Sequence, residues 1–148
     1  MKKGLLLCLV LIWTMLLLQG CAFMEPEISK TVEISSSGKS VNAILKSDSE
    51  QNYKWICFSE KGNLDEVRSK FKKSMFSNTY IQDYKFNMDD VGTDTLYLVY
   101  YLPDDLENGK VYTYKVTLSE KNVLSIEEEK ESSLFYHEDL LKRVQEMQ

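Results

Sequence analysis

Four short segments with the composition of β-strands follow one another closely in the second half of the chain. Residues 80–88, 95–102 and 110–118 are rich in aromatic and aliphatic side chains, and a fourth segment is expected at 123–127. The stretches between them are short and carry Asp, Asn, Gly and Pro, which are turn residues. Short connections make neighbouring strands antiparallel. The sequence therefore predicts an antiparallel meander of four strands.

The first half of the chain adds further strands. Residues 31–34 alternate in polarity, 35–39 have turn chemistry, and 41–45 resume an apolar pattern, which together predict a β-hairpin. Residues 53–59 carry Tyr, Trp, Ile and Phe, which suit a half-buried sheet surface. We expect a strand there.

A helix is predicted between these strands and the meander. Asn63 and Glu66 have the spacing of a helix N-cap with a reciprocal carboxylate. Apolar residues then recur at helical intervals, namely Leu64, Val67, Phe71 and Met75. The pattern predicts an amphipathic helix over 64–76, with Arg68, Lys70, Lys72 and Lys73 on its solvated side.

A second helix is expected at the C-terminus, where Ser133 can cap a helix running from Leu134. Its apolar face would carry Leu140, Leu141, Val144 and Met147. The predicted fold class is α+β: an antiparallel sheet meander packed on one amphipathic helix, plus a C-terminal helix. This element order resembles the cystatin-like and NTF2-like architectures, a likeness that carries no motif and transfers no site residue.

The N-terminus has the features of a targeting segment. Lys2 and Lys3 precede a run from Gly4 to Leu18 that contains no charge, about the length of a signal-peptide core. A transmembrane helix needs about 20 apolar residues, so this run is short for a span. An uncleaved N-terminal anchor is the alternative, and both interpretations place the protein on a membrane.

The sequence Leu18-Gln19-Gly20-Cys21 resembles the lipobox of bacterial lipoproteins. The resemblance implies that the thiol of Cys21 accepts a diacylglyceryl group and that cleavage falls between Gly20 and Cys21. It implies a signal peptide at 1–20, a lipidated N-terminus and short tether at 21–30, and a single globular domain at 31–148. The domain would lie outside the cytoplasm, anchored by its lipid to the cell membrane or an outer membrane.

The charge balance excludes one class of partner. The chain has 18 Lys and Arg against 23 Asp and Glu, and removal of residues 1–20 takes away two lysines and no acid. The remainder carries a formal charge of about −7, which repels phosphate backbones. We therefore expect no nucleic-acid partner.

Cysteine and histidine offer little for catalysis. Of the three cysteines, Cys8 leaves with the signal peptide and Cys21 is consumed by lipid, so Cys57 has no partner for a disulfide. Cys57 lies among large apolar residues, which favours a buried hydrophobic role. A dyad of Cys57 with His137, the single histidine, is conceivable, but His137 is more simply a surface helix residue. We predict no catalytic residue and no enzymatic activity.

Two acidic clusters lie in the predicted turns: Asp89, Asp90 and Asp94, and then Asp104, Asp105 and Glu107. Neither has the alternating order of a calcium-binding loop. Acidic residues are common in turns for structural reasons. We predict no metal site, and no cofactor other than the covalent lipid on Cys21.

Tyrosines are the most suggestive residues for binding. Tyr97, Tyr101, Tyr112 and Tyr114 lie on adjacent predicted strands. Alternation places Tyr97 and Tyr101 on one face of their strand, opposite Tyr100, and places Tyr112 and Tyr114 on a common face of the next. Such strands could form an aromatic binding face for a glycan or peptide. The alternative is that other elements cover both faces.

These observations favour a membrane-anchored, non-enzymatic binding or accessory domain at the cell envelope, which contacts another envelope protein or a surface ligand. One alternative is a small-ligand sensor or hydrolase with a pocket between helix and sheet. Another is an immunity or exclusion lipoprotein that acts on another envelope protein.

Overall fold

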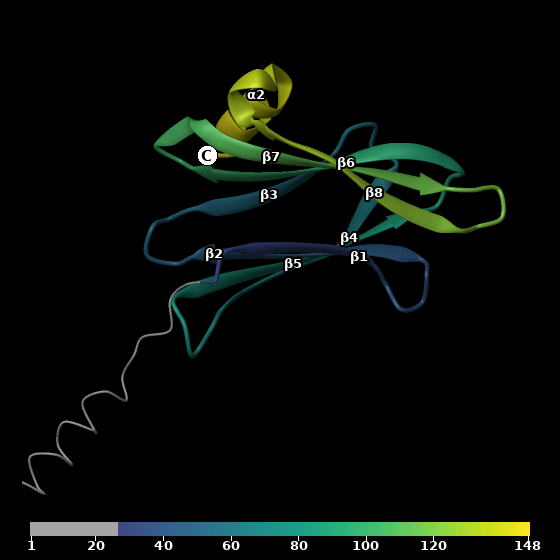
Figure 1. Ribbon diagram of the computed structural model, residues 1–148, viewed down its shortest axis with the longest axis horizontal. Coiled ribbons are helices and arrows are strands. Elements are labelled where there is room, and N and C mark those ends of the chain that lie inside the picture. The colour runs from purple at the N-terminus through teal and green to yellow at the C-terminus, as the bar shows by residue number, and fades with distance from the viewer. Residues whose placement is uncertain (1–26) are drawn as a thin grey trace, which may run out of the picture.

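Alternation of buried and exposed side chains builds two antiparallel sheets in residues 27–148, the part of the chain described by the computed structural model. The first sheet has the order β1-β2-β5-β4, and the second has the order β3-β6-β7-β8 (Figure 1). The strands of the first sheet are β1 (Ser29–Ile34), β2 (Ser40–Asp48), β5 (Thr79–Met88) and β4 (Leu64–Lys73). Those of the second are β3 (Lys54–Ser59), β6 (Gly92–Leu102), β7 (Asp105–Leu118) and β8 (Leu124–Ser133).

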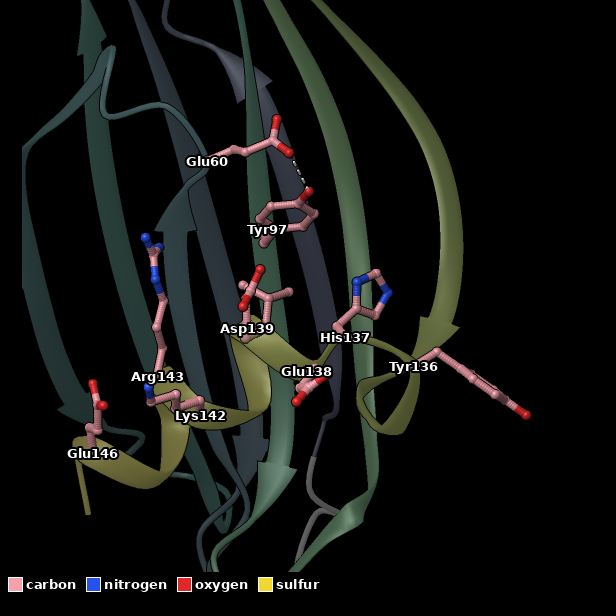
Figure 2. Close-up of a pocket in the computed structure, with 10 residues that line it drawn as sticks. Glu60, Tyr97, Tyr136, His137, Glu138, Asp139, Lys142, Arg143 and Glu146 are labelled. Atoms are coloured by element: carbon pink, nitrogen blue, oxygen red, sulfur yellow. Dashed lines mark hydrogen bonds between the residues drawn. The ribbon is translucent and has the colours of Figure 1, made fainter.

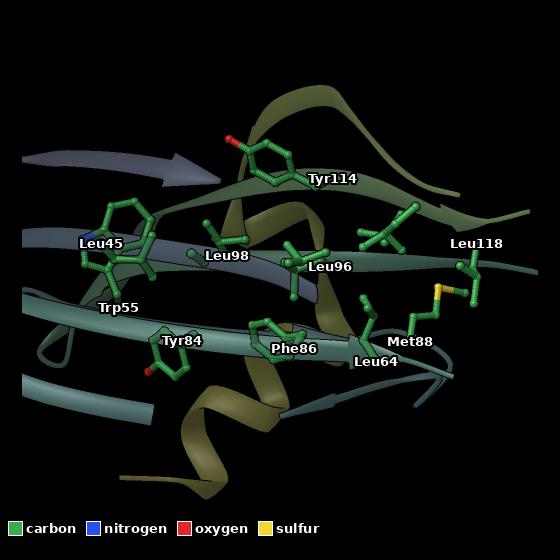
Figure 3. Close-up of a cluster of buried hydrophobic side chains, with 14 residues drawn as sticks. Leu45, Trp55, Leu64, Tyr84, Phe86, Met88, Leu96, Leu98, Tyr114 and Leu118 are labelled. Atoms are coloured by element: carbon green, nitrogen blue, oxygen red, sulfur yellow. The ribbon is translucent and has the colours of Figure 1, made fainter. Parts of the chain in front are cut away.

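The main core lies between the two sheets (Figure 3). Alternate residues of β2 and β6 are fully buried there, namely Val41, Ala43, Leu45, Leu96 and Leu98. Trp55 of β3 joins this core, and its indole Nε1 donates a hydrogen bond to the carbonyl oxygen of Lys46 at 3.0 Å. The indole therefore ties the second sheet to the first while it fills the space between them.

A second, smaller core covers the outer face of the second sheet. A 3₁₀-helix, η1 (Leu134–Tyr136), and the helix α2 (Glu138–Glu146) pack there, burying Leu134 and Val144 against Val99 and Val111. Gly109 makes the close approach possible, because a Cβ atom there would lie 3.0 Å from the Leu134 side chain. Figure 1 shows α2 lying across this sheet, on the side away from β5.

The start of the C-terminal helical segment confirms the predicted Ser133 cap, with one difference. The Phe135 backbone N–H donates to Ser133 Oγ at 3.3 Å, so Ser133 does cap a helical turn. That turn is η1, and it ends at His137, whose backbone (φ −118°, ψ 76°) is not helical. The α-helix begins only at Glu138.

The predicted helix over 64–76 is wrong, because this segment forms strand β4 and pairs with β5. The backbone N–H of Asn63 donates to Asp94 at 2.9 Å and serves a turn between strands. Pairing along the whole length of β5 outweighs the local helical spacing of the apolar residues. A bulge between Glu66 and Arg68 also shifts the alternation, which disguises the strand pattern in the sequence.

The predicted four-strand meander is also only partly correct. Strands β6, β7 and β8 form a meander, but β5 lies in the other sheet, between β2 and β4. Both edges of β5 are thus occupied, and β6 has no free edge of β5 to pair with.

Other expectations agree with the structure. The hairpin of β1 and β2 and the strand β3 are confirmed. The strand β1 begins at Ser29, so Ser29 and Lys30 belong to the domain and not to the tether. The fold is mostly antiparallel sheet with one C-terminal helical segment, broadly α+β. Within residues 27–148 there is no helix wrapped by the sheet, as cystatin-like and NTF2-like architectures would require, and no helix long and apolar enough to cross a bilayer.

Candidate functional site

The four tyrosines of the predicted aromatic face do not share one surface. Tyr97 and Tyr101 point to the outer face of the second sheet, beneath the helical segment, where Tyr101 is buried. Tyr112 and Tyr114 point to the inner face and pack on the main core. The alternation expected within each strand is present, but the register pairs Tyr97 with Thr113, which places the two pairs on opposite sides.

Tyr112 and Tyr114 instead meet Lys30 of β1. The Lys30 Nζ atom donates to the Tyr114 hydroxyl at 2.8 Å and lies 4.5 Å from the ring centre of Tyr112. It also forms an ion pair with Glu128 of β8. Burial opposes the charge on Lys30, but hydrogen bonds to Glu128 and Tyr114 hold its pKa above the ordinary value. These contacts join the two sheets at one edge, so this pair of tyrosines has a structural role.

A groove of about 590 Å³ lies between α2 and the outer face of the second sheet (Figure 2). Glu60 and Tyr97 line the sheet side, and residues of the helical segment line the other side. The helical residues are Tyr136, His137, Glu138, Asp139, Leu140, Lys142, Arg143 and Glu146. The groove thus combines charged and aromatic side chains in one concave polar site.

Hydrogen bonds fix the sheet side of the groove. The Tyr97 hydroxyl donates to Glu60 Oε1 at 3.1 Å. Burial, and then this hydrogen bond, raise the pKa of Tyr97, so the phenol stays protonated near neutral pH. The Tyr97 ring also lies 6.2 Å from the ring of His137, centre to centre. A tyrosine face is therefore held at the bottom of the groove.

Carboxylates give the groove its charge. Four line it, Glu60, Glu138, Asp139 and Glu146, against two cations, Lys142 and Arg143. The ion pairs that residues 27–148 form all lie elsewhere. Glu138 and Asp139 also stand in the first turn of α2, where negative charge suits the helix dipole. Even so, their carboxylates are exposed and available to a cationic ligand.

An exposed aromatic side chain, Tyr136, lines the groove, and its ring contacts that of Phe135. Phe135 and Tyr136 are 56% and 80% exposed, and their rings meet edge to face at 5.6 Å between centres. Figure 2 shows Tyr136 projecting away from the strands. Exposed aromatic residues beside a polar depression are typical anchors of protein interfaces.

His137 makes one contact of chemical interest. Its Nε2 atom lies 2.6 Å from the hydroxyl oxygen of Ser132. Cys57, the other half of the conceivable dyad, is on the opposite face of the sheet, because it pairs with Leu98 and packs on the main core. Burial, and then the negative charge of Glu66, raise the pKa of the Cys57 thiol. The structure thus separates Cys57 from His137.

The acidic clusters do not converge on a metal site. Asp94 is buried and accepts hydrogen bonds from Ser59 and from backbone N–H groups of the turn between β3 and β4, whereas Asp89 and Asp90 are exposed. Asp105 accepts hydrogen bonds from Asn108. No group of three or more His, Cys, Asp or Glu side chains within residues 27–148 could hold a metal ion.

Sequence reasoning identified Tyr97 and considered His137, but it did not place them in one groove. The available signal was the adjacent pair Phe135 and Tyr136 beside the acids that open α2.

The predicted signal peptide, the cleavage site at Gly20 and Cys21, and the lipid-bearing Cys21 lie outside the described residues. Comparison with protein-family models, curated proteins and solved structures gave no match to this chain.

Proposed function

We propose that this protein is a lipid-anchored, non-enzymatic accessory domain of the cell envelope that binds a cationic segment of another envelope protein. The lipid would be carried by Cys21, and the binding site would be the groove between α2 and the second sheet. The observation that carries the binding proposal is the combination, at this groove, of carboxylates that form no ion pair with a described residue and an exposed aromatic ring, that of Tyr136.

The anchor is supported by the sequence alone. A diacylglyceryl group adds two acyl chains, and at roughly 0.8 kcal/mol per buried methylene two chains contribute on the order of 20 kcal/mol. Such an anchor is not released by dilution. The domain would then meet its partners at the membrane, outside the cytoplasm.

The partner chemistry follows from the groove. Carboxylates of Glu60 and Asp139 attract lysine or arginine side chains, and the phenol of Tyr97 offers a flat surface between them. Phe135 and Tyr136 would contact apolar residues that flank the cationic segment. A nucleic acid or an acidic peptide would be repelled by the same carboxylates.

Photocrosslinking in cells tests the binding site. Tyr136 is replaced by the photoreactive amino acid p-benzoylphenylalanine, with the exposed Val123, on the turn between β7 and β8, as the matched control position. We expect a crosslinked envelope protein from position 136 and not from position 123, with the crosslinked peptide rich in Lys or Arg. The double variant Glu138→Lys/Asp139→Lys should lose the product, whereas Glu120→Lys should keep it. Equal products at both positions would reject the site.

Metabolic labelling with palmitate tests the anchor. The wild-type protein should take up label and the variant Cys21→Ala should not. A wild-type protein that remains unlabelled would reject the anchor without bearing on the groove.

The contact between Ser132 and His137 favours a second candidate, a small hydrolase. A histidine nitrogen 2.6 Å from a serine hydroxyl can accept its proton and activate it as a nucleophile. Among the described residues, no carboxylate hydrogen-bonds His137, so the third member of a triad is missing. Hydrolysis of p-nitrophenyl acetate tests this candidate: activity that Ser132→Ala abolishes would support it, and activity that persists in Ser132→Ala would reject it.

A further inference from the structure

The turn between β4 and β5 presents apolar side chains to solvent. Met75 and Phe76 are 89% and 81% exposed. The turn is closed by a hydrogen bond from the Ser74 N–H to the Thr79 carbonyl at 2.8 Å, and the Phe76 N–H donates to Ser74 Oγ. An ordered backbone thus presents the two side chains to solvent. Adjacent exposed side chains of this size mark a contact surface.

Lysines surround this apolar tip. Lys70 and Lys72 alternate along β4 on the outer face of the first sheet, and Lys73 lies 5.9 Å from the ring centre of Tyr80. None of the three takes part in an ion pair with a described residue. The nearest acid across the strand, Asp83, is paired with Arg68 instead, at 2.8 Å. Glu50 lies beside the same turn, where it accepts a hydrogen bond from Asn78, but it pairs with none of these lysines. Three lysines against this one carboxylate leave a net positive charge on the β4 side of the tip.

The first described residue lies against the same end of the domain. The Glu27 N–H donates to Thr79 Oγ1 at 3.1 Å, and the Glu27 carboxylate pairs with Lys46 at 2.7 Å. Figure 1 shows the described chain starting beside β5, at the end where the turn between β4 and β5 projects. Cys21 precedes Glu27 by six residues in the sequence. Whatever its conformation, a chain of that length reaches at most about 21 Å.

We propose that Lys70, Lys72, Lys73, Met75 and Phe76 form a membrane-contacting surface that docks the domain on a leaflet of anionic phospholipids. This proposal rests on the proposed lipid at Cys21, which would bring the turn close to the bilayer. Met75 and Phe76 enter the interfacial layer, and the lysines lie over the phosphate groups. The helix α2 and its groove lie on the outer face of the second sheet and take no part in this surface.

Quenching of tryptophan fluorescence by brominated lipids tests the contact in the lipid-bearing protein, which begins at Cys21 in the proposal and so lacks Trp13; it is purified from membranes and reconstituted in vesicles. Phe76→Trp places a fluorophore on the surface, and Val123→Trp is the matched control at the opposite end of the sandwich. Trp55 is buried in both and gives a common background. With brominated phosphatidylcholine and phosphatidylglycerol, we expect quenching roughly twofold stronger or more for Phe76→Trp than for Val123→Trp.

The charge requirement is tested with Lys70→Glu/Lys72→Glu in the Phe76→Trp protein. This double variant should lower the quenching in phosphatidylglycerol vesicles to the level of the control position. The double variant Lys115→Glu/Lys121→Glu changes the charge equally at exposed positions away from the turn and should leave the quenching unchanged. Circular dichroism confirms that each variant is folded.

The two proposals fail in different ways. Mass spectrometry of the same preparations reports whether Cys21 carries lipid. A protein without lipid overturns the anchor and with it the reason for bringing the turn to the bilayer. A lipidated protein in which positions 76 and 123 are quenched equally overturns the membrane-contacting surface and leaves the anchor standing.

Discussion

The Ser59 hydroxyl donates a hydrogen bond to Asp94 Oδ2 at 2.6 Å, linking the end of β3 to the start of β6. The same carboxylate accepts the backbone N–H groups of Lys61, Asn63 and Thr95, at 2.7 to 3.0 Å. A buried carboxylate with several donors organises the whole turn between β3 and β4.

Asp94→Asn should therefore lower the free energy of unfolding by about 3 kcal/mol, because the amide NH₂ would face backbone donors. Urea denaturation measures this loss. Asp90→Asn, at an exposed position in the preceding turn, is the control and should leave the midpoint almost unchanged. Equal midpoints for the two variants would contradict the role given to Asp94.

The loss of folding stability at acidic pH should also depend on Asp94. Burial alone would raise the pKa of this carboxyl, but hydrogen bonds from Ser59 and from backbone N–H groups lower it below the ordinary value. A lowered folded-state pKa gives stability that is present above the ordinary pKa of about 4 and is lost as pH falls through the lower folded value. The midpoint temperature of thermal unfolding should fall for the wild type as pH decreases through that window. For Asp94→Asn the midpoint temperature should fall less steeply. Parallel profiles would refute this linkage.

Lys30 should stabilise the contact between the two sheets. Lys30→Met keeps most of the aliphatic stem but removes the charge that holds Tyr114 and Glu128, and we expect a loss of roughly 1 kcal/mol in the free energy of unfolding. Lys39→Met, at an exposed turn position, is the matched control. Chemical denaturation distinguishes them, and a loss no larger for Lys30→Met than for Lys39→Met would count against the contact.

The docking of α2 should depend on Val144, which is fully buried. Val144→Ala leaves a small cavity against the second sheet and should cost roughly 2 kcal/mol. Met147→Ala, on the exposed end of the segment, should cost roughly 0.5 kcal/mol or less. Hydrogen exchange of the α2 amides reports the effect directly: faster exchange in Val144→Ala alone is expected, and unchanged exchange would show that α2 is held by other contacts.

The loss of folding stability at alkaline pH should depend on Tyr100, which lies in a cluster of aromatic rings. Tyr100 lies between Tyr53 and Trp55, with ring centres at 4.8 and 4.7 Å. Burial, and then the neighbouring tyrosine and carboxylate charges, raise the pKa of Tyr100 to about 12. The unfolded phenol ionises near its ordinary pKa of about 10, so stability should decrease as pH rises from there toward the folded value. Several tyrosines, Tyr84 among them, also have pKa values raised by burial, so tyrosinate absorbance should show a late step that Tyr100→Phe reduces by one phenol and does not abolish.

The sequence predicted strands where burial alternates over several consecutive residues, as in β2, β6 and β7. It failed at β4, where the apolar residues happen to recur at helical intervals and a bulge at Glu66 breaks the strand period. It also failed to assign β5 to its sheet, because a short connection such as that after Met88 is equally compatible with a hairpin and with a crossing between sheets. Which strand occupies which edge is a tertiary property and leaves little local signal.

At the candidate site, too, local patterns were predicted correctly and the tertiary arrangement was not. Alternation correctly placed Tyr97 and Tyr101 on one face, but only the register with β7 decides that Tyr112 points to the other. Proximity of Glu60 to Asp139 depends on how α2 packs, and no local spacing encodes it.

If the proposed lipid on Cys21 holds this protein on a membrane, the position of β4 at the edge of its sheet has a consequence. Copies held in a plane meet far more often than copies in solution, and an open strand edge invites pairing with another chain. The lysines of β4 and the bulge near Arg68 oppose such pairing, because like charges repel and the bulge interrupts the ladder. The same side chains that we assign to lipid contact would thus also keep crowded neighbours from joining edge to edge.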